Sequence, residues 1–193
     1  MDKKILIGIQ GGRGSFNEEA VLMYIQVNRI KDTHIKHLHT AENVLRELNE
    51  GTIHQGQFAV HNTFGGIVHE SIRAMGKYNF NLIGDYTLQI EHALMIHPDA
   101  KMAEVDTIMA HPQVFEQCET KLAEKYKQLK QVVGEGDLAD HAKVAQHLSD
   151  GKLPANVAVM GSRVLAQVYG LKIVEEGLQD KKDNFTTFLL VKK

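Results

Sequence analysis

The feature that most constrains the fold of this chain is the alternation of short apolar runs with amphipathic helical windows. Three of the runs, residues 4–9, 157–160 and 188–191, have the length of buried strands. Ser15 and Glu18 have the spacing of a capping box, in which Ser15 accepts a hydrogen bond at the start of a helix. Strands that alternate with helices of this length imply parallel sheet, so the sequence predicts an α/β fold.

The ends of further helices are also predicted. Thr40 is placed to cap a helix that Gly51 closes, and Pro112 suits the first position of another. Asp137 is placed to cap a third helix, which Gly151 closes.

Ligands bind at the carboxyl ends of strands in such sheets, near helix N-termini. Candidate binding residues are therefore expected in the loops after Ile9, Val60, Ala110 and Met160, and before Phe188.

Composition limits the possible functions. The 193 residues are enough for one ordinary domain or two small lobes, and a hydrophobic content of 43% supports a packed core. The formal net charge of −2 argues against a nucleic-acid partner, which needs a concentrated basic face. The first apolar run, from Ile5 to Ile9, is too short for a secretion signal or a membrane span. We expect a soluble cytoplasmic protein with no membrane partner.

Neither a metal site nor a nucleophilic cysteine is predicted. His34, His37 and His39 have no Cys or Asp/Glu cluster nearby to complete a tetrahedral set, so they are interpreted as surface histidines. Cys118, the single cysteine, is interpreted as a small buried residue. A pair of Cys118 with His111 lacks the orienting third residue of a nucleophile motif.

The glycine-rich segment 11–15 lies between a predicted strand and a predicted helix. Exposed N–H groups and the helix dipole favour an anion there, while a simple tight turn fits the pattern equally well. Arg13 favours a carboxylate ligand, because guanidinium matches carboxylate geometry.

Five segments, taken together, resemble the catalytic domain of prephenate dehydratases, in matching order and spacing. They are Gly11–Phe16 (G-P-x-G-T-F-S in the family), Val60–Gly66 (P-I-E-N-S-x-x-G), Ala110–Gln113 with Gln117 and Cys118 (S-H-P-Q…Q-C), Ala158–Ser162 with Tyr169–Leu171 (A-A-I-x-S…Y-G-L), and Gln179 and Asp180 with Asn184–Phe188 (Q-D…N-x-T-R-F).

The resemblance implies two Rossmann-like α/β lobes around a cleft, similar to a type II periplasmic binding protein. Lobe 1 would comprise residues 1–84 and 175–193, and lobe 2 residues 85–174. The implied reaction is the decarboxylating dehydration of prephenate to phenylpyruvate in phenylalanine biosynthesis, without cofactor or metal. A homodimer is also implied. Because the chain stops after the last family motif, we expect no ACT-type regulatory domain.

Carried over position by position, the resemblance assigns the catalytic role to Thr186 and substrate binding to residues around it. The substrate-binding set is Arg13, Ser15, His61, Asn62, Thr63, Gln113, Gln117, Thr187 and Phe188.

Several positions depart from the family pattern. The arginine of T-R-F, which holds substrate carboxylate in the family, is Thr187, and the glutamate of E-N-S is His61. The serine of S-H-P-Q is Ala110, and the family's S-T-A segment corresponds to residues 137–139. A charge-assisted hydrogen bond contributes about 1.5–3 kcal/mol. We hypothesise that Arg13 and His61 relocate positive charge, so that the cleft binds an anion in a different pose.

Three functions remain open, each with a small anionic molecule as partner. The first is the dehydratase, which the intact Thr186, Asn62 and Gln117 favour. The second is a non-catalytic protein that binds or senses a small carboxylate on the same scaffold. The third is an enzyme for a related cyclohexadienyl acid, with His61 as the acid–base group.

Overall fold

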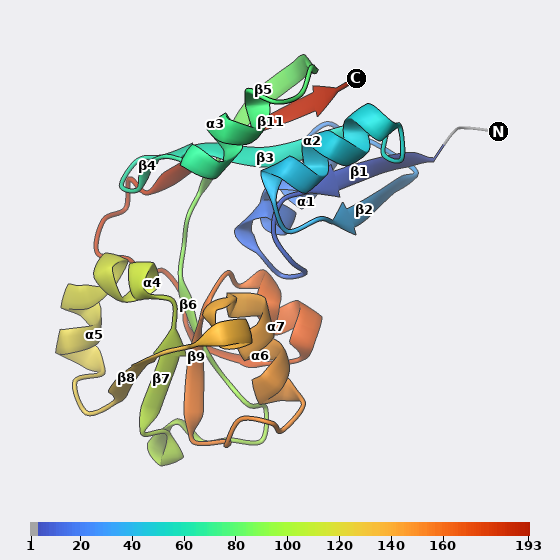
Figure 1. The fold of residues 1–193 in the computed structure, drawn as a ribbon. Coiled ribbons are helices and arrows are strands. Elements are labelled where there is room, and N and C mark those ends of the chain that lie inside the picture. The colour runs from blue at the N-terminus through green and yellow to red at the C-terminus, as the bar shows by residue number, and fades with distance from the viewer. Residues whose placement is uncertain (1–3) are drawn as a thin grey trace. The chain divides into compact units, whose positions relative to one another are not determined.

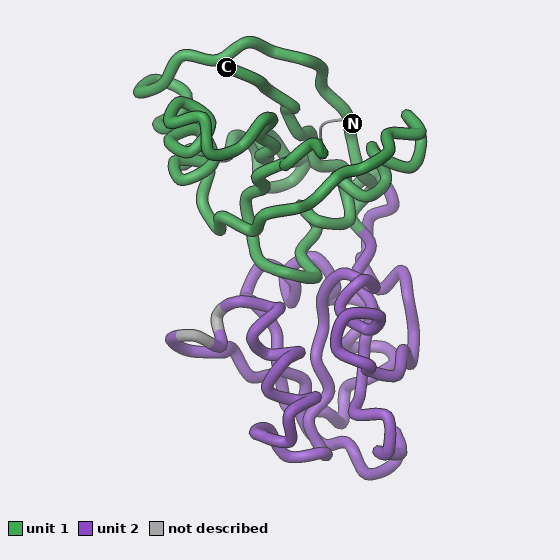
Figure 2. Tube along the Cα trace, turned by 90° about the vertical axis from the view of Figure 1, so that its right-hand side faces the viewer, with its two compact units in different colours: residues 1–90, 183–193 green, residues 91–182 purple. Residues whose placement is uncertain are grey.

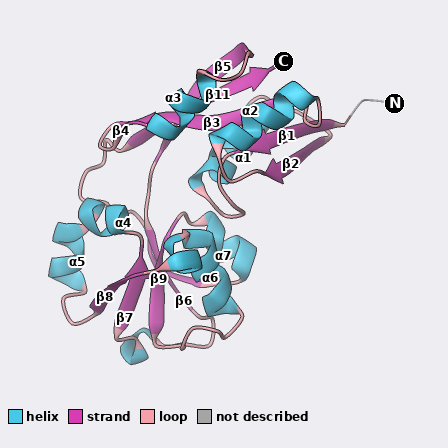
Figure 3. Ribbon diagram, viewed as in Figure 1, coloured by secondary structure: helices cyan, strands magenta, loops and turns pink. Residues whose placement is uncertain are grey.

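A computed structural model describes residues 4–193, except for the side chains of residues 137 and 139. The chain forms two compact units (Figure 2). Unit 1 is built from Met1–Ile90 and Asp183–Lys193, and unit 2 from Glu91–Lys182. Each unit contains its own β-sheet together with helices (Figure 3), so the predicted α/β class with two sheets is confirmed. The expected cleft stays a prediction.

The sheet of unit 1 has the strand order β2-β1-β3-β11-β5, and β4 pairs with β3. Strand β1 is parallel to β2 and β3, whereas β11 is antiparallel to β3 and β5. The sheet is therefore mixed and not parallel throughout, because β11 enters from a separate segment of the chain. The elements are β1 (Ile5–Ile9), α1 (Phe16–Val27), β2 (Thr33–His37), α2 (Ala41–Glu50), β3 (Gln55–Asn62), β4 (Gly66–Ile67), α3 (His69–Met75), β5 (Asn81–Gln89) and β11 (Phe185–Lys192).

Helix α1 covers one face of this sheet, and α2 and α3 cover the other (Figure 1). The predicted ends of α2 are confirmed: the Thr40 side chain accepts a hydrogen bond from the Asn43 N–H at 3.1 Å, and Gly51 closes the helix at φ 77°. The predicted Ser15 cap of α1 is confirmed in the same way. The buried side of α2 repeats at helical spacing. It consists of Ala41, Val44, Leu45 and Leu48.

Unit 2 has the strand order β10-β6-β9-β7-β8, with β7 parallel to β8 and β9, and β6 antiparallel to β9 and β10. Helices α4 and α5 pack on one face, and α6 and α7 on the other (Figure 1). The elements are β6 (Ala93–Ile96), the 3₁₀ helix η1 (Met102–Glu104), β7 (Thr107–Ala110), α4 (Pro112–Gln117), α5 (Glu119–Lys125), β8 (Lys130–Val133), the 3₁₀ helix η2 (Gly136–Ala139), α6 (His141–Ser149), β9 (Val157–Gly161), α7 (Val164–Tyr169) and β10 (Lys172–Glu175).

One helix start differs from the prediction. Asp140, not Asp137, caps α6, and its side chain accepts a hydrogen bond from the Ala142 N–H at 2.9 Å. Residue 137 belongs to the 3₁₀ helix η2, which precedes α6. Its side chain lies outside the described part of the chain. Within residues 4–193, no helix has the length and apolar character needed to cross a membrane.

The chain passes between the units later than the expected positions near Gly84 and Glu175. It leaves unit 1 after Ile90 and returns at Asp183. The reason is the pairing of β5 with β11, which extends to the Gln89–Phe185 pair and keeps all of β5 in unit 1.

Phe188 belongs to the core of unit 1, although the resemblance assigns it to substrate binding. Its side chain is 1% exposed. It packs among residues of α1, β3 and β5, and its ring centroid lies 5.9 Å from that of Tyr86. This position follows from strand alternation, which turns Phe188 toward the face covered by α1.

We predict that Phe188→Ala lowers the free energy of unfolding by about 3–5 kcal/mol, because it removes a fully buried ring and leaves a cavity. Urea denaturation of both proteins measures the difference. Phe185→Ala, at a side chain 38% exposed, is the matched control and should change stability much less. Equal effects of the two substitutions would contradict the assignment of Phe188 to the core.

Candidate functional site

Thr186, the predicted catalytic residue, lies directly across from Asn62 in the antiparallel pairing of β11 with β3. The Asn62 side-chain Nδ2 donates a hydrogen bond to the Thr186 hydroxyl oxygen at 2.9 Å. Since that bond uses an oxygen lone pair, the hydroxyl hydrogen remains available. No acceptor for it is present among the described residues. Thr186 can therefore donate a hydrogen bond to another group.

Asn62 is held on both sides of its amide. Nδ2 also donates to Asn184 Oδ1 at 2.9 Å and to a neighbouring backbone carbonyl at 3.2 Å. Its Oδ1 accepts from the backbone N–H groups of Phe64 and Gly65, at 2.9 and 2.8 Å. Both polar atoms of the side chain thus bind protein groups. The geometry gives Asn62 the role of orienting Thr186.

Thr63 fastens the returning chain to the end of β3. Its hydroxyl donates to the Asp183 carbonyl at 2.9 Å and accepts from the Phe185 N–H at 3.0 Å. Its own N–H donates to the Phe185 carbonyl at 2.9 Å. The side chain predicted to bind substrate is therefore engaged in joining β3 to β11.

His61 and Thr187 form the next cross-strand pair of β3 and β11. Successive residues of a strand point to opposite faces. Thr187 therefore points away from the face that carries Thr186. His61 is exposed and Thr187 partly buried. The structure brings His61 and Thr187 together, and separates them from the Asn62–Thr186 pair.

The glycine-rich loop 11–15 is a turn closed by a carboxylate of the chain itself. The Gly14 N–H donates to the Glu18 side chain, and the Glu18 N–H donates to the Ser15 hydroxyl at 3.3 Å. The N–H groups of Gly11 and Ser15 donate to backbone carbonyls. Gly11 and Gly14 have φ of 86° and 82°, where glycine is favoured. Of the two interpretations left open by the sequence, the structure supports the tight turn.

Glu18 is buried and binds His37 as well as the loop. His37 Nε2 lies 2.9 Å from Glu18 Oε1, so this histidine, predicted to be on the surface, is a partner of a buried carboxylate. Burial raises the pKa of Glu18. The hydrogen bonds from His37 and Gly14 and the charges of His37 and Arg13 outweigh burial and leave the pKa below its ordinary value.

In unit 2, Gln117 is positioned by a network around a buried histidine. His92 is 3% exposed, and its Nε2 lies 2.7 Å from Gln117 Oε1. The His92 N–H donates to Gln179 Oε1 at 3.1 Å, and the Asp180 N–H donates to the Gln117 carbonyl at 2.8 Å. Burial lowers the pKa of His92, against the effect of Gln117. The Gln-Asp motif thus fixes His92 and Gln117.

Two more imidazoles lie at this end of unit 2. His111 caps α4, and its Nδ1 accepts from the Gln113 N–H at 3.2 Å. The His111 ring centroid is 5.7 Å from that of His141, the first residue of α6. Burial, followed by the charges of His92 and His111, lowers the pKa of His141 to about 4, against the effect of Asp140. The Gln113 side chain is exposed.

Cys118 is fully buried, as predicted, and burial raises the pKa of its thiol to about 12. It is therefore a thiol at neutral pH and a poor nucleophile. Ala110, in the position of the family's serine, is 2% exposed. Among residues 4–193 with described side chains, no group of three or more His, Cys, Asp or Glu residues is arranged to hold a metal ion.

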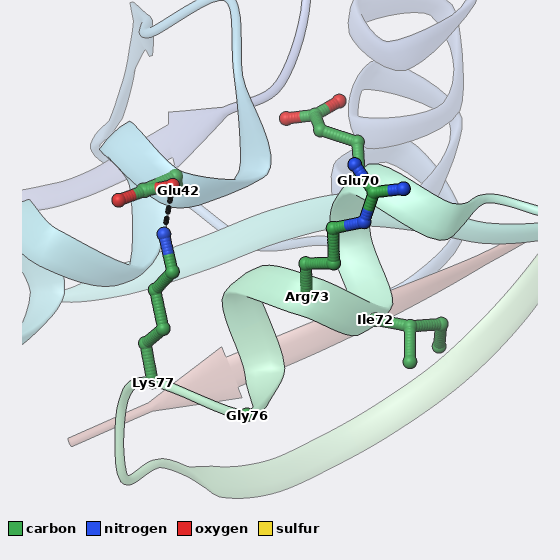
Figure 4. Close-up of a pocket in the computed structure, with 6 residues that line it drawn as sticks. All are labelled: Glu42, Glu70, Ile72, Arg73, Gly76 and Lys77. Atoms are coloured by element: carbon green, nitrogen blue, oxygen red, sulfur yellow. Dashed lines mark hydrogen bonds and ion pairs between the residues drawn. The ribbon is translucent and has the colours of Figure 1, made fainter.

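A separate surface pocket of about 520 Å³ lies beside α2 and α3 (Figure 4). In it, Lys77 pairs with Glu42 at 2.8 Å. Glu70 uses its carboxylate to accept from the Ala41 N–H at 2.7 Å. None of the residues predicted to form the site lines this pocket. The lining residues are Glu42, Glu70, Ile72, Arg73, Gly76 and Lys77.

Comparison with known proteins identifies the family of this chain. The family model described as prephenate dehydratase matches residues 7–193. The chain belongs to the prephenate dehydratase family. The resemblance carried by the five sequence segments is therefore confirmed.

Individual members of the prephenate dehydratase family are distant. The bifunctional chorismate mutase/prephenate dehydratase of Escherichia coli (strain K12) is 27% identical over 149 residues, which are 77% of this chain and 37% of that protein. The arogenate dehydratase/prephenate dehydratase 2 of Arabidopsis thaliana is 23% identical over 97% of this chain and 46% of its own length. The chain thus spans less than half of these relatives.

Among solved structures, the prephenate dehydratase from Arthrobacter aurescens in complex with L-Phe is similar, with a TM-score of 0.84 and 21% identity. The match covers 98% of this chain and 60% of that one. At 21% identity, this structural similarity supports the assignment of the fold.

The prephenate dehydratase pattern explains one feature of the altered positions. The glutamate of E-N-S and the arginine of T-R-F correspond to His61 and Thr187, which are cross-strand neighbours. In the family pattern these positions carry opposite charges, a favourable cross-strand pair. Here both charged residues are replaced, by His61 and Thr187. The two departures thus fall on one cross-strand pair of β3 and β11.

Sequence reasoning missed two histidines of the site. His92 lies in no quoted motif, and no spacing rule relates it to Gln117, 25 positions along the chain. His141 was hidden because the helix that it begins was predicted to start at Asp137. Two aspartates, Asp137 and Asp140, precede the helix, and the preference for aspartate at a helix start does not distinguish between them.

We predict that Asn62→Asp lowers the free energy of unfolding by about 1–3 kcal/mol and disturbs Thr186. The substitution keeps an oxygen for the Phe64 and Gly65 N–H groups but replaces the donor that faces Asn184 and Thr186. Urea denaturation at neutral pH measures the loss. An unchanged stability would show that the amide donor is not needed to hold β11.

Glu18→Gln should make the protein less stable at neutral pH by about 1–3 kcal/mol. Because the folded-state pKa lies below the ordinary value of 4.5, the carboxylate's contribution is present above that value and is lost as pH falls through the folded pKa. Denaturation curves of both proteins should therefore converge in acid. A difference that persists unchanged at low pH would contradict this role. Glu19→Gln, at the next residue of α1, is the control.

Proposed function

We propose that this chain catalyses the decarboxylating dehydration of prephenate to phenylpyruvate. The observation that carries the proposal is the Thr186 hydroxyl, which Asn62 orients while its hydrogen remains available. The reaction expels hydroxide and carbon dioxide from prephenate and forms an aromatic ring. Its barrier is lowered by a group that protonates the departing hydroxide.

Asn62 supports proton donation as well as orientation. As Thr186 gives up its proton, negative charge develops on its oxygen, and the Asn62 Nδ2 donor already points at that oxygen from 2.9 Å. A donor fixed in advance stabilises developing charge without reorganisation. The loop N–H groups bound to Asn62 Oδ1 keep this donor in place.

The binding of the substrate carboxylate groups is assigned to two other predicted residues, Arg13 and His61. Arg13 is exposed beside the glycine-rich loop, and His61 is exposed at the end of β3. We propose that both supply positive charge in place of the family's arginine. Gln113 and Gln117 are proposed to donate hydrogen bonds to the substrate. Thr63 and Phe188 are left with the structural roles described above.

A second candidate is the corresponding reaction of arogenate. Relatives named arogenate dehydratase support it, including one of Petunia hybrida that is 28% identical over 132 residues. The exchange of the T-R-F arginine for Thr187 changes the group that the family uses for carboxylate, so substrate choice has to be measured. The same assays address both acids.

The test is product formation from prephenate and from arogenate by the purified chain, measured against the spontaneous reaction. We expect turnover of prephenate that Thr186→Val reduces by about 10²–10⁴-fold, the usual contribution of a positioned acid. Thr186→Ser, which keeps the hydroxyl, should retain much of the rate. Turnover of arogenate alone would replace the first candidate with the second.

A folded protein that binds either acid without turnover would support the non-catalytic carboxylate-binding function instead. Equal rates of the wild type and Thr186→Val would show catalysis that does not depend on this hydroxyl, and would remove Thr186 from the mechanism.

A further inference from the structure

Asn184 joins the Thr186 site to a neighbouring strand, although it is not among the predicted site residues. It is 1% exposed and directly precedes β11. Its backbone carbonyl accepts a hydrogen bond at 2.7 Å from the N–H of Ile90, which directly follows β5. Its side-chain Oδ1 accepts from Asn62 Nδ2 at 2.9 Å, at the end of β3. The Asn184 side chain is therefore held at the shared edge of β3, β11 and β5.

The Asn62 amide nitrogen has more acceptors within reach than it has hydrogens. A carboxamide nitrogen carries two hydrogens. Asn184 Oδ1 and Thr186 Oγ1 each lie 2.9 Å from Asn62 Nδ2, and the Phe185 carbonyl lies 3.2 Å from it. The two nearer oxygens take one hydrogen each. Because the two N–H bonds of a planar amide diverge at a fixed angle, holding one on Asn184 directs the other at Thr186.

The direction of the Asn62 amide decides whether Thr186 keeps its hydrogen for another group. With the nitrogen toward Thr186, the hydroxyl oxygen accepts a hydrogen bond and its hydrogen stays available. With the amide turned over, Asn62 Oδ1 would accept that hydrogen and would also face Asn184 Oδ1, oxygen against oxygen. Asn184 therefore disfavours the orientation in which Thr186 is not a donor. The N–H groups of Phe64 and Gly65 act in the same sense from the other end of the amide.

We propose that Asn184 is a positioning residue, which holds the Asn62 amide nitrogen toward Thr186 and so keeps the Thr186 hydroxyl a proton donor. The effect on catalysis rests on the proposed function, whereas the hold on the amide does not. Since Asn184 is buried and its backbone is bound to Ile90, the amide is oriented before a ligand arrives. A donor fixed in advance needs no reorganisation during the reaction.

The first test measures hydrogen exchange of side-chain amides in the full chain by nuclear magnetic resonance, without substrate. In the wild type, the Asn62 amide should exchange about tenfold more slowly, or slower still, than the amide of Asn81, an exposed residue of β5. In Asn184→Leu, which removes the acceptor, exchange of the Asn62 amide should become about tenfold faster. Urea denaturation establishes that the variant is folded under the conditions of the measurement.

Two further variants separate the hydrogen bond from the burial of the side chain. Asn184→Asp keeps an oxygen in the position of Oδ1 and should keep the Asn62 amide protected. Asn81→Leu makes the leucine exchange at an exposed position of the same sheet, and should leave exchange of the Asn62 amide unchanged. If Asn184→Leu does not fold, the wild-type comparison and Asn184→Asp decide the question.

The second test uses turnover of the acid that the wild type converts. Asn184→Leu should lower kcat about tenfold with little change in KM, because it disturbs the donor and leaves substrate contacts in place. In the Thr186→Val background, the same substitution should have no further effect, since the hydroxyl through which it acts is absent. A merely structural role of Asn184 would lower kcat by the same factor in both backgrounds.

The proposal is overturned if the wild-type Asn62 amide exchanges as fast as that of Asn81, or if neither substitution of Asn184 distinguishes an acceptor from its loss. An equal loss of kcat with and without the Thr186 hydroxyl also overturns it. A wild type that converts neither prephenate nor arogenate refutes the proposed function. The exchange measurement, which requires no turnover, then decides by itself whether Asn184 orients the amide.

Discussion

The insertion of β11 between β3 and β5 is the constraint on which unit 1 depends. The last strand of the chain returns after the whole of unit 2 and completes a sheet begun by the first strand, so the closure joins residues 124 positions apart. Its entropic cost grows only slowly with loop length, and backbone pairing along both edges of β11 offsets it. The same insertion buries Phe188, makes the sheet mixed, and sets Thr186 opposite Asn62.

Many polar residues of the family motifs bind other protein groups. Asn62 and Thr63 join the ends of β3 and β11, and Gln179 holds the backbone of His92. Glu18, just after the first motif, closes the glycine-rich loop in the same way. Buried polar groups must be satisfied, and these pairs satisfy one another while fixing a few side chains in place. The motif residues therefore make contacts within the protein that hold the site together, and binding a ligand is not their only role.

Family membership and altered motif residues are compatible in this chain because the alterations leave that framework in place. His61 and Thr187 stand where the family pattern has residues of opposite charge, at positions that pair across two strands. The Asn62–Thr186 pair on the other face is intact.

The sequence by itself determined the α/β class, the Ser15 and Thr40 caps and the family, because these follow from local periodicity, capping and motif order. Only the tertiary structure decided which groups the candidate site residues contact. Phe188 is buried in the core, and the Glu18 carboxylate accepts a hydrogen bond from the glycine-rich loop. Helix α6 begins at His141, and His92 contacts Gln117. The physical reason is range: a cap or an amphipathic stripe is set by neighbours within a few residues, whereas strand register and side-chain partners depend on segments that only folding brings together.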